Sequence, residues 1–297
     1  MINTDKPLIS VVIPAYNRAY IIKDSLQSVL DQTYTNIEVV VVDDGSSDET
    51  ADVIDAIEDE RVLKCVRVTP NQGPSHARNA GVDAANGDYI AFQDSDDFWK
   101  PDKLEKQYQL MIDGGYDMVG CGMIRTERGK TFFFPKSGFP EAENLVKEIT
   151  LENRIGTPTV LIKKEAFNRV RFDEGMRGME DWDFGIRAAK ALKIGFVNEA
   201  LFESEVQPNS LSKILNQCKL LENLYHKHED LINSYTDVRA FYMRGIGNGY
   251  LYEKPAAAFR YYLESLKCKW SIQSFIRLLM SIAFWPFIHK KNTANEQ

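Results

Sequence analysis

The sequence predicts an α/β fold: a mostly parallel β-sheet flanked by helices, followed by a helical extension towards the C-terminus. Three observations predict it. Short β-branched apolar runs alternate with helical patterns in the first part of the chain, as expected of βαβ units. The chain has 297 residues, 44% of them apolar, which is enough for one large α/β domain and a smaller helical part. After residue 210 nearly every segment has a helical pattern.

The first βαβ unit is predicted from two strands and the helix between them. Residues 8–13 and 37–42 are β-branched apolar runs of the kind that parallel sheets bury on both faces. Between them, apolar residues from Ile21 to Leu30 recur at three- and four-residue spacing, which predicts an amphipathic helix ending near Gln32.

The alternation continues along the chain and then loosens after residue 97. We expect helices at 48–58, 75–85, 101–112 and 182–193, and strands at 62–68, 89–93, 117–124, 131–134 and 194–202. A loop with Gly138 and Pro140 follows the strand at 131–134. The domain boundary is expected near Asn209, which gives an α/β domain of residues 1–209 and a helical region of residues 210–297.

Composition and charge restrict the partners and the location of the chain. The net charge is −7 and the sequence pI is about 5.3, so a nucleic acid would meet a repulsive average field and is not expected as a partner. The four cysteines include no CxxC pair, which predicts neither a zinc knuckle nor a disulfide framework and favours a reducing cytoplasm. The polar N-terminus lacks a secretory pattern, so the mature chain is expected to begin at its start codon.

The C-terminal part differs in charge from the rest of the chain. Residues 255–297 contain six Lys or Arg and two Glu, and the apolar stretch 276–288 within them is too short to span a bilayer. Two interpretations stay open: a helix that lies on a membrane surface, and a helix that packs on the domain with its lysines solvated. The first would place a cytoplasmic protein peripherally on the inner face of the plasma membrane.

Polar residues follow each predicted strand at the edge where open parallel sheets bind ligands. They are Pro14-Ala15-Tyr16-Asn17, Asp43-Asp44-Gly45-Ser46, Asn71-Gln72-Gly73 and Asp94-Ser95-Asp96-Asp97. Carboxylates there would oppose a nucleotide, because two unit charges at about 4 Å repel by roughly 4 kcal/mol at an effective dielectric constant of about 20. A divalent cation reverses that effect, and the oxygen ligands of Asp94 and Asp96 suit Mg²⁺ or Mn²⁺.

Five ordered blocks of the sequence resemble one known family. The blocks are Ser10-Val-Val-Ile-Pro-Ala-Tyr-Asn17, Val41-Val-Asp-Asp-Gly-Ser-Ser-Asp48, Asn71-Gln-Gly-Pro-Ser-His-Ala-Arg-Asn-Ala-Gly81, Gly87-Asp-Tyr-Ile-Ala-Phe-Gln-Asp-Ser-Asp-Asp97 and Met179-Glu-Asp-Trp-Asp183. Together they are similar to the inverting glycosyltransferases of family 2, which have the GT-A fold and use nucleotide-diphosphate sugars. The resemblance covers roughly the first two hundred residues and is far more specific than a lone DxD motif. It does not extend to the helical tail.

The resemblance implies a nucleotide-sugar site at the strand ends, with binding residues Pro14, Tyr16, Asp43, Asp44, Arg78, Asp94 and Ser95. Tyr16, two residues after Pro14, would lie against the base. Asp44, beside Asp43, would accept a hydrogen bond from the base, which is consistent with uracil because its ring N–H needs an acceptor. Taken singly, Tyr16 is better explained as a packed aromatic residue, and the two aspartates as a turn or a helix cap. Their order at successive strand ends favours the functional interpretation.

The resemblance also implies roles around the diphosphate. Asp94 and Asp96, on either side of Ser95, look like the DxD pair, with Asp94 near the ribose and Asp96 on a Mn²⁺ or Mg²⁺ ion. Arg78 resembles the basic residue that the family places near the nucleotide and the sugar. The family often has a histidine at the position of Gln207, where a metal-ligand role cannot simply be inherited by glutamine.

The Glu180-Asp181 pair is predicted to begin a helix, where a carboxylate can complement the helix dipole without any catalytic role. In the resembling family, the aspartate of this pair deprotonates the acceptor hydroxyl, so Asp181 is the implied catalytic base. The chain lacks the QxxRW motif and the flanking transmembrane helices of the processive members, which implies one sugar per encounter. Members similar to this chain commonly assemble bacterial cell-surface glycans, often on lipid-linked acceptors.

Two alternative functions are kept open. A sugar-1-phosphate nucleotidyltransferase also places a nucleotide and a metal on an α/β sheet, but it would usually have a Gly-rich phosphate loop where this chain has Pro14-Ala15-Tyr16. A non-catalytic sugar-nucleotide-binding module would be expected to lack the DxD pair or the base, and this sequence has both.

Overall fold

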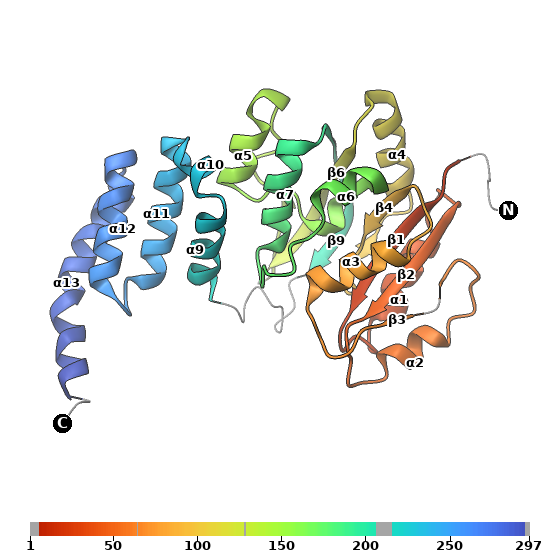
Figure 1. Cartoon of the computed structure of the whole chain (residues 1–297), viewed down its shortest axis with the longest axis horizontal. Helices are drawn as coiled ribbons and strands as arrows, with labels where there is room; N and C mark the ends of the chain where they lie inside the picture. Colours follow the sequence, from red (N-terminus) through yellow and green to blue (C-terminus); the bar gives the residue numbers. More distant parts are fainter. Residues whose placement is uncertain (1–5, 64, 128, 206–215, 295–297) are drawn as a thin grey trace. The chain divides into compact units, whose positions relative to one another are not determined.

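The structure is a computed structural model that describes residues 6–63, 65–127, 129–205 and 216–294, with side chains of the last helix described as far as Ala283. The chain divides into two compact units, residues 1–207 and 208–297. Figure 1 shows that the first unit combines strands with helices and that the second is helical. The domain boundary expected near Asn209 lies outside the described residues.

The first unit is built on one mixed β-sheet, whose described strands number nine. The strands are β1 (Ile9–Ala15), β2 (Ile37–Asp43), β3 (Val66–Arg67), β4 (Tyr89–Phe92), β5 (Phe98–Trp99), β6 (Met118–Glu127), β7 (Lys130–Phe134), β8 (Leu161–Lys163) and β9 (Ile194–Glu205). Their order across the sheet is β3-β2-β1-β4-β8-β6-β9-β5, and β7 pairs with β6. Strands β3, β2, β1 and β4 run parallel, whereas β8 runs antiparallel to β4 and β6.

Strands β1 and β2 lie at the centre of the parallel part because their Val and Ile side chains are buried on both faces. Their register places Ala15 opposite Asp43, and β4 pairs with the other side of β1. The carboxyl ends of β1, β2 and β4 therefore meet at one edge of the sheet, where the loops after these strands can form a common site (Figure 1).

Helices surround this sheet. They are α1 (Ile22–Leu30), α2 (Thr50–Asp55), α3 (Pro74–Ala84), α4 (Lys103–Gly114), α5 (Leu145–Leu151), α6 (Lys164–Val170) and α7 (Glu180–Ala191), with 3₁₀ turns at Ala142–Asn144 and Thr157–Thr159. Helix α5 packs on α7. Helix α1 buries Ile22, Leu26 and Val29, at the predicted helical spacing. Helix α3 approaches β1 closely at Gly81, where any side chain would collide with Val12.

The predicted fold class is confirmed, and the differences lie in short elements. Strand β3 is shorter than the expected strand at 62–68, and α2 covers only part of the expected helix at 48–58. Between the loop at Gly138 and the helix expected at 182 the sequence predicts no element, yet α5, β8 and α6 lie there. Each of these has seven residues or fewer, which is too short for a clear hydrophobic period.

The second unit consists of helices over the residues that the structure describes. They are α9 (Gln217–Lys227), α10 (Glu229–Asn233), α11 (Thr236–Tyr250), α12 (Pro255–Cys268) and α13 (Ile272–Ala294), as predicted from the pattern after residue 210. A small core of Leu251, Ala258 and Tyr262 joins α11, α12 and α13, with Leu278 packed against it. None of the helices in the described ranges combines the length and the apolarity needed to cross a bilayer.

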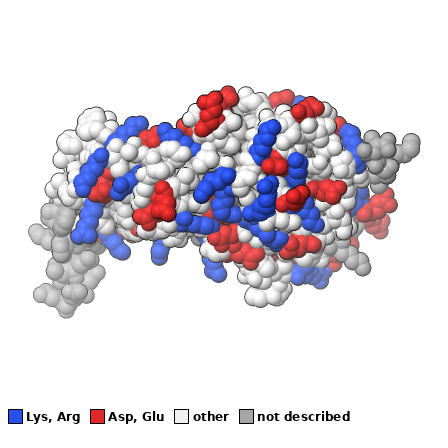
Figure 2. Space-filling model, turned by 45° about the horizontal axis from the view of Figure 1, so that its top comes forward, with Lys and Arg blue, Asp and Glu red and all other residues white. Residues whose placement is uncertain are grey.

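The charged side chains are mixed in sign over the face that Figure 2 presents. Basic and acidic residues alternate there over short distances. The acidic residues of that face are therefore not gathered into one acidic field.

Candidate active site

The loop after β1 presents the ring of Tyr16. Asn17 has a left-handed backbone, with φ 54°, a conformation that asparagine tolerates better than most residues. Its N–H donates to the Ser46 hydroxyl at 2.9 Å, and its side-chain oxygen accepts the N–H of Ser47 at 2.9 Å. These bonds fasten the loop to the one after β2, while the Tyr16 side chain stays 47% exposed. A half-exposed ring on a fixed backbone is suited to stacking on a planar group.

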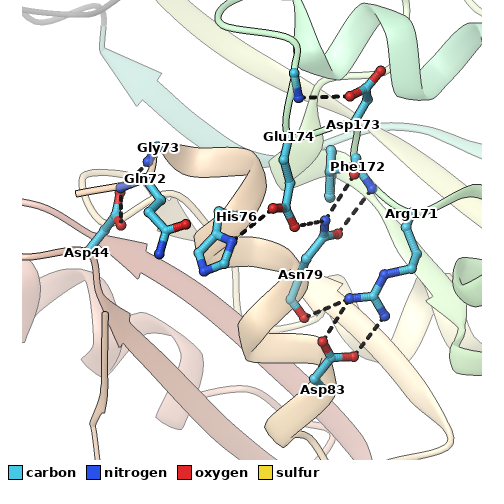
Figure 3. A network of polar contacts seen from close by, with 11 residues as sticks. Asp44, Gln72, Gly73, His76, Asn79, Asp83, Arg171, Phe172, Asp173 and Glu174 are labelled. Atoms are coloured by element: carbon cyan, nitrogen blue, oxygen red, sulfur yellow. Dashed lines mark hydrogen bonds and ion pairs between the residues drawn. The ribbon is translucent and has the colours of Figure 1, made fainter. Parts of the chain in front are cut away.

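Asp43 and Asp44 organise the loops after β2 and β3. Asp43 Oδ1 accepts the N–H of Ser46 at 3.1 Å. Asp44 Oδ1 accepts the N–H of Gln72 at 2.9 Å, and Oδ2 accepts the N–H of Gly73 at 2.8 Å (Figure 3). Gly73 has φ 93°, which favours glycine, so the chain can turn both N–H groups towards Asp44. Asp44 thus has backbone partners that the sequence did not indicate, and each oxygen keeps capacity for one further donor.

The acidic run after β4 brings three carboxylates into one tight turn. The N–H of Asp97 donates to the carbonyl of Asp94 at 3.0 Å, which closes the turn around the buried Ser95. Burial raises the pKa of Asp96, and the charge of Asp94 raises it further. Asp97 is buried, and burial, followed by the charge of Asp94, raises its pKa well above the ordinary value. These carboxylates repel one another, and a cation beside them would relieve that repulsion.

The carboxylate oxygens of this acidic run fit a divalent cation whose remaining ligands come from a bound phosphate compound and water. Asp94 and Asp96 are both partly exposed and offer hard oxygen ligands. Within the described ranges no three His, Cys, Asp or Glu side chains gather as a complete metal centre. Mg²⁺ commonly binds one or two carboxylates together with substrate phosphates and water. The run therefore suits an ion that binds together with a nucleotide diphosphate.

Arg18 links the loop after β1 to the acidic run, a role that the sequence did not indicate. Its Nη2 lies 3.6 Å from Asp96 Oδ2, and its Nη1 donates to the Tyr16 carbonyl at 3.4 Å. The proximity of Arg18 lowers the pKa of Asp96 and so offsets part of the rise caused by burial. Pro14, another predicted binding residue, lies within β1 opposite Val42.

Arg78 joins the acidic run to the start of α7. Its Nη2 donates to Asp94 Oδ1 at 2.8 Å, and its Nη1 donates to Glu180 Oε1 at 3.3 Å. The side chain is buried, and burial alone would lower its pKa, but the charges of Asp94 and Glu180 outweigh burial and raise the pKa. The guanidinium therefore stays charged and holds two segments that are far apart in the sequence.

Helix α3 also holds the segment that leads to α7 (Figure 3). Asn79 Nδ2 donates to the Phe172 carbonyl at 2.9 Å, and Asn79 Oδ1 accepts the Phe172 N–H at 3.1 Å. Arg171 pairs with Asp83 of α3 at 2.8 Å. These bonds set the ring of Phe172 with its centroid 5.4 Å from the Arg78 guanidinium, so apolar and polar contacts together fix that arginine.

Asp181 lies in the first turn of α7 and is partly exposed. Its Oδ2 accepts the side-chain N–H of Asn153 at 2.8 Å, and its Oδ1 accepts the N–H of Trp182 at 2.8 Å. Burial first, and then the neighbouring charge of Glu180, raise the pKa of Asp181 to about 6, while Asn153 offsets part of the rise. A carboxylate with this pKa is mostly ionised at neutral pH and is more basic than an ordinary aspartate.

The other carboxylates in this turn are already paired. Glu180 contacts Arg78, and the buried Asp183 pairs with Arg187 at 2.7 Å. Asp181 therefore differs from both in that its hydrogen bonds come from the amide of Asn153 and the N–H of Trp182. Gln207, whose relation to the metal the sequence left open, lies outside the described residues.

A family model and two related sequences identify the family. Residues 10–173, more than half of the chain, match the family model described as glycosyl transferase family 2. The putative teichuronic acid biosynthesis glycosyltransferase TuaG of Bacillus subtilis is 37% identical over 70% of this chain and 82% of its own length. An uncharacterized glycosyltransferase of Haemophilus influenzae is 32% identical over 76% of this chain and 90% of its own length.

Solved structures have the same fold at low identity. The TarS fragment 1–349 of S. aureus matches with a TM-score of 0.63 and 18% identity, over 97% of this chain and 91% of the fragment. The mannosyltransferase PcManGT of Pyrobaculum calidifontis, solved with GDP-Man and Mn²⁺, matches with a TM-score of 0.61 and 17% identity, over 96% of this chain and 84% of that chain. With the family match to residues 10–173 and the strand-end loops described above, the chain belongs to glycosyl transferase family 2 and has the GT-A fold.

Proposed function

We propose that this glycosyltransferase moves one sugar per encounter from a nucleotide diphosphate, with uridine as the nucleoside, to an acceptor hydroxyl with inversion. The observation that carries the proposal is the Arg78 bridge. One buried guanidinium contacts Asp94 of the acidic run at 2.8 Å and Glu180, the neighbour of Asp181, at 3.3 Å. The acidic run and the turn that carries Asp181 are thus held by the same side chain, through Asp94 and Glu180.

The donor would lie across the carboxyl ends of β1, β2 and β4. The exposed ring of Tyr16 would stack on the base, and Asp44 would accept the ring N–H of uracil beside its two backbone donors. Asp94 would lie near the ribose. Mn²⁺ or Mg²⁺ held by Asp96 would offset the negative charge of the diphosphate. TarS has been solved with UDP and with UDP-GlcNAc, and PcManGT with GDP-Man and Mn²⁺, which supports this class of donor.

Asp181 would act as the general base. It would accept the proton of the acceptor hydroxyl while the acceptor oxygen attacks the anomeric carbon on the face opposite the diphosphate. The bond from that carbon to the diphosphate oxygen breaks, the nucleoside diphosphate leaves with the electron pair, and the proton stays on Asp181. The pKa of about 6 supports this role, since general bases work best when their pKa is near the working pH.

We place the acceptor among bacterial cell-surface glycans or their lipid-linked precursors, with transfer on the cytoplasmic side of the membrane. The relative TuaG is named for teichuronic acid biosynthesis, which supports a cell-surface glycan.

A panel of nucleotide sugars tests this function without the acceptor. Unfolding temperatures are measured with UDP-, GDP- and dTDP-sugars in Mn²⁺, because a ligand of the native state alone raises stability. We expect a UDP-sugar to give the largest rise, and a GDP-sugar doing so would contradict the uridine assignment. Slow hydrolysis of the bound UDP-sugar to UDP would then show that the chain is an enzyme and not a non-catalytic binding module. Formation of a nucleotide sugar from a sugar phosphate would favour the nucleotidyltransferase alternative.

A further inference from the structure

Along its described part, helix α13 buries two serines, packs Leu278 and Met280 against the core of its unit, and leaves five large apolar side chains exposed. Ser274 and Ser281 lie seven residues apart on one helix face and are both buried. The exposed large apolar side chains, each between 41% and 56% accessible, are Ile272, Phe275, Ile276, Leu279 and Ile282. A helix that only packed on its own domain would show the reverse distribution.

Hydrogen bonds fix the serine face of α13 towards α12. Ser265 of α12 donates to the Ala240 carbonyl at 2.9 Å, and its hydroxyl lies 3.0 Å from that of Ser274. Ser271, just before the helix, donates to Ser274 at 2.9 Å. Rotating α13 to bury Phe275 would break these bonds. The outward position of the apolar side chains is therefore set by the packing of the unit itself.

The charge around this apolar face indicates what it contacts. Between Ser265 and Asn295 the sequence has five Lys or Arg and no Asp or Glu, in a chain whose net charge is −7. Lys267, which pairs with Glu264 at 2.7 Å, and Lys269 are exposed just before α13, and Trp270 beside them is 69% exposed. Exposed apolar side chains with lysines and tryptophan at their edge are typical of helices that lie in the interface of an anionic bilayer.

We propose that this face binds the surface of a bilayer that contains anionic lipids. We name it the α13 face and define it as Ile272, Phe275, Ile276, Leu279 and Ile282, with Lys267, Lys269 and Trp270 at its edge. The helix would lie in the plane of the membrane, with the lysines against anionic headgroups and the apolar side chains between the lipids. The proposal goes beyond sugar transfer and does not depend on the identity of the donor.

The apolar contribution is tested with the full chain and a matched control. Ile276→Asn/Leu279→Asn removes two side chains that are each 50% exposed, and Ile112→Asn removes an isoleucine that is 48% exposed on α4 of the first unit. Flotation with phosphatidylcholine vesicles that contain phosphatidylglycerol should show binding by the wild type and by Ile112→Asn. The double variant should lose at least about tenfold in vesicle affinity, because each buried methylene contributes to partitioning. Circular dichroism should show unchanged helix content.

The electrostatic contribution is tested by removing equal charge at two places. Lys267→Gln/Lys269→Gln should weaken binding to vesicles with phosphatidylglycerol, and Lys23→Gln/Lys190→Gln, which removes two exposed lysines of the first unit, should not. Added salt should weaken wild-type binding in the same direction.

Three results would overturn the proposal. The first is a wild-type chain that stays unbound to anionic vesicles. The second is equal binding by the wild type and Ile276→Asn/Leu279→Asn. The third is a dimer in light scattering that the same double variant converts to monomer while vesicle binding is unchanged, which would mean that a second copy of the chain covers the α13 face.

Discussion

The side-chain amide of Asn153 donates to Oδ2 of Asp181 at 2.8 Å, although the two residues are 28 positions apart. The second oxygen of Asp181 accepts the N–H of Trp182. Both bonds favour the ionised carboxylate and so lower its pKa, while burial and Glu180 raise it to the net value of about 6. Asn153 thus orients the proposed base and limits how far its pKa rises.

The pH dependence of the transfer rate should depend on the hydrogen bond between Asn153 and Asp181. The rate of a single turnover should fall as the pH drops through about 6, because a protonated Asp181 cannot accept the proton of the acceptor. Asn153→Ala should move this acidic limb to higher pH, by up to about one pH unit, since it removes a hydrogen bond worth about 1 kcal/mol from the charged form. Asn223→Ala, at an exposed position of α9, is the control. An unshifted limb in Asn153→Ala would show that another group titrates.

Stability should change in the opposite direction to activity when Asp181 is neutralised. The pKa of Asp181 is higher in the folded chain than its ordinary 3.8, so protonation stabilises the fold. That stability is present below about pH 3.8 and is lost as the pH rises through about 6. Asp181→Asn escapes this loss and should raise the free energy of unfolding at about pH 8 by about 1 to 3 kcal/mol, with the gain shrinking towards about pH 4.

Urea unfolding at both pH values measures this effect. Asp183→Asn is the matched control, because it removes a buried carboxylate that is paired with Arg187 and should lower the free energy of unfolding. A loss of stability in Asp181→Asn at high pH would contradict the inferred environment of the carboxylate.

Arg78 should matter for the stability of the fold. Arg78→Met removes the buried partner of Asp94 and Glu180, which are both partly exposed, and should lower the free energy of unfolding by about 1 to 3 kcal/mol. Arg78→Lys should recover only part of this loss, because an ammonium group cannot reproduce the two-way contact of a guanidinium. Arg171→Met, which breaks a more exposed pair with Asp83, should cost about 1 kcal/mol or less. Equal losses in the two methionine variants would disprove the bridging role.

Removing the metal should weaken donor binding, because the proposed ion is held by Asp96 and contacts the diphosphate. Calorimetry should show tighter binding of UDP with Mn²⁺ or Mg²⁺ than with a chelator, and Asp96→Ala should abolish the difference. Asp88→Ala, at an exposed position before β4, should retain it. Metal-independent affinity in the wild-type chain would remove the cation from the proposed mechanism.

The sequence predicts the parts of this site that depend on local pattern. Strands β1, β2 and β4 are apolar runs followed by polar turns, and the topology of a parallel sheet brings those turns to one edge. The position of Asp181 at the start of a helix follows from the helical pattern after it. For Asp43, Asp44 and Asp181, the local pattern alone did not distinguish a functional role from a turn or a helix cap. The resemblance to the family supplied the functional roles.

The contacts between distant segments could not be predicted from one sequence. Arg78 and Glu180 are separated by 102 positions, and nothing local to either residue indicates the other. Asn153 lies in a segment where the helices and strand are too short to show a period. The direction in which α13 turns its apolar side chains depends on the hydrogen bonds between Ser265 and Ser274, which belong to tertiary packing.

The most direct test of the proposed chemistry is single-turnover transfer by Asp181→Asn together with its calorimetric donor affinity. Asparagine has nearly the same shape but cannot accept the acceptor proton. We predict a loss of about a hundred- to ten-thousand-fold in the transfer rate, or roughly 3 to 5 kcal/mol, with donor affinity nearly unchanged. Transfer at the wild-type rate by a folded Asp181→Asn would contradict the assignment of Asp181 as the base.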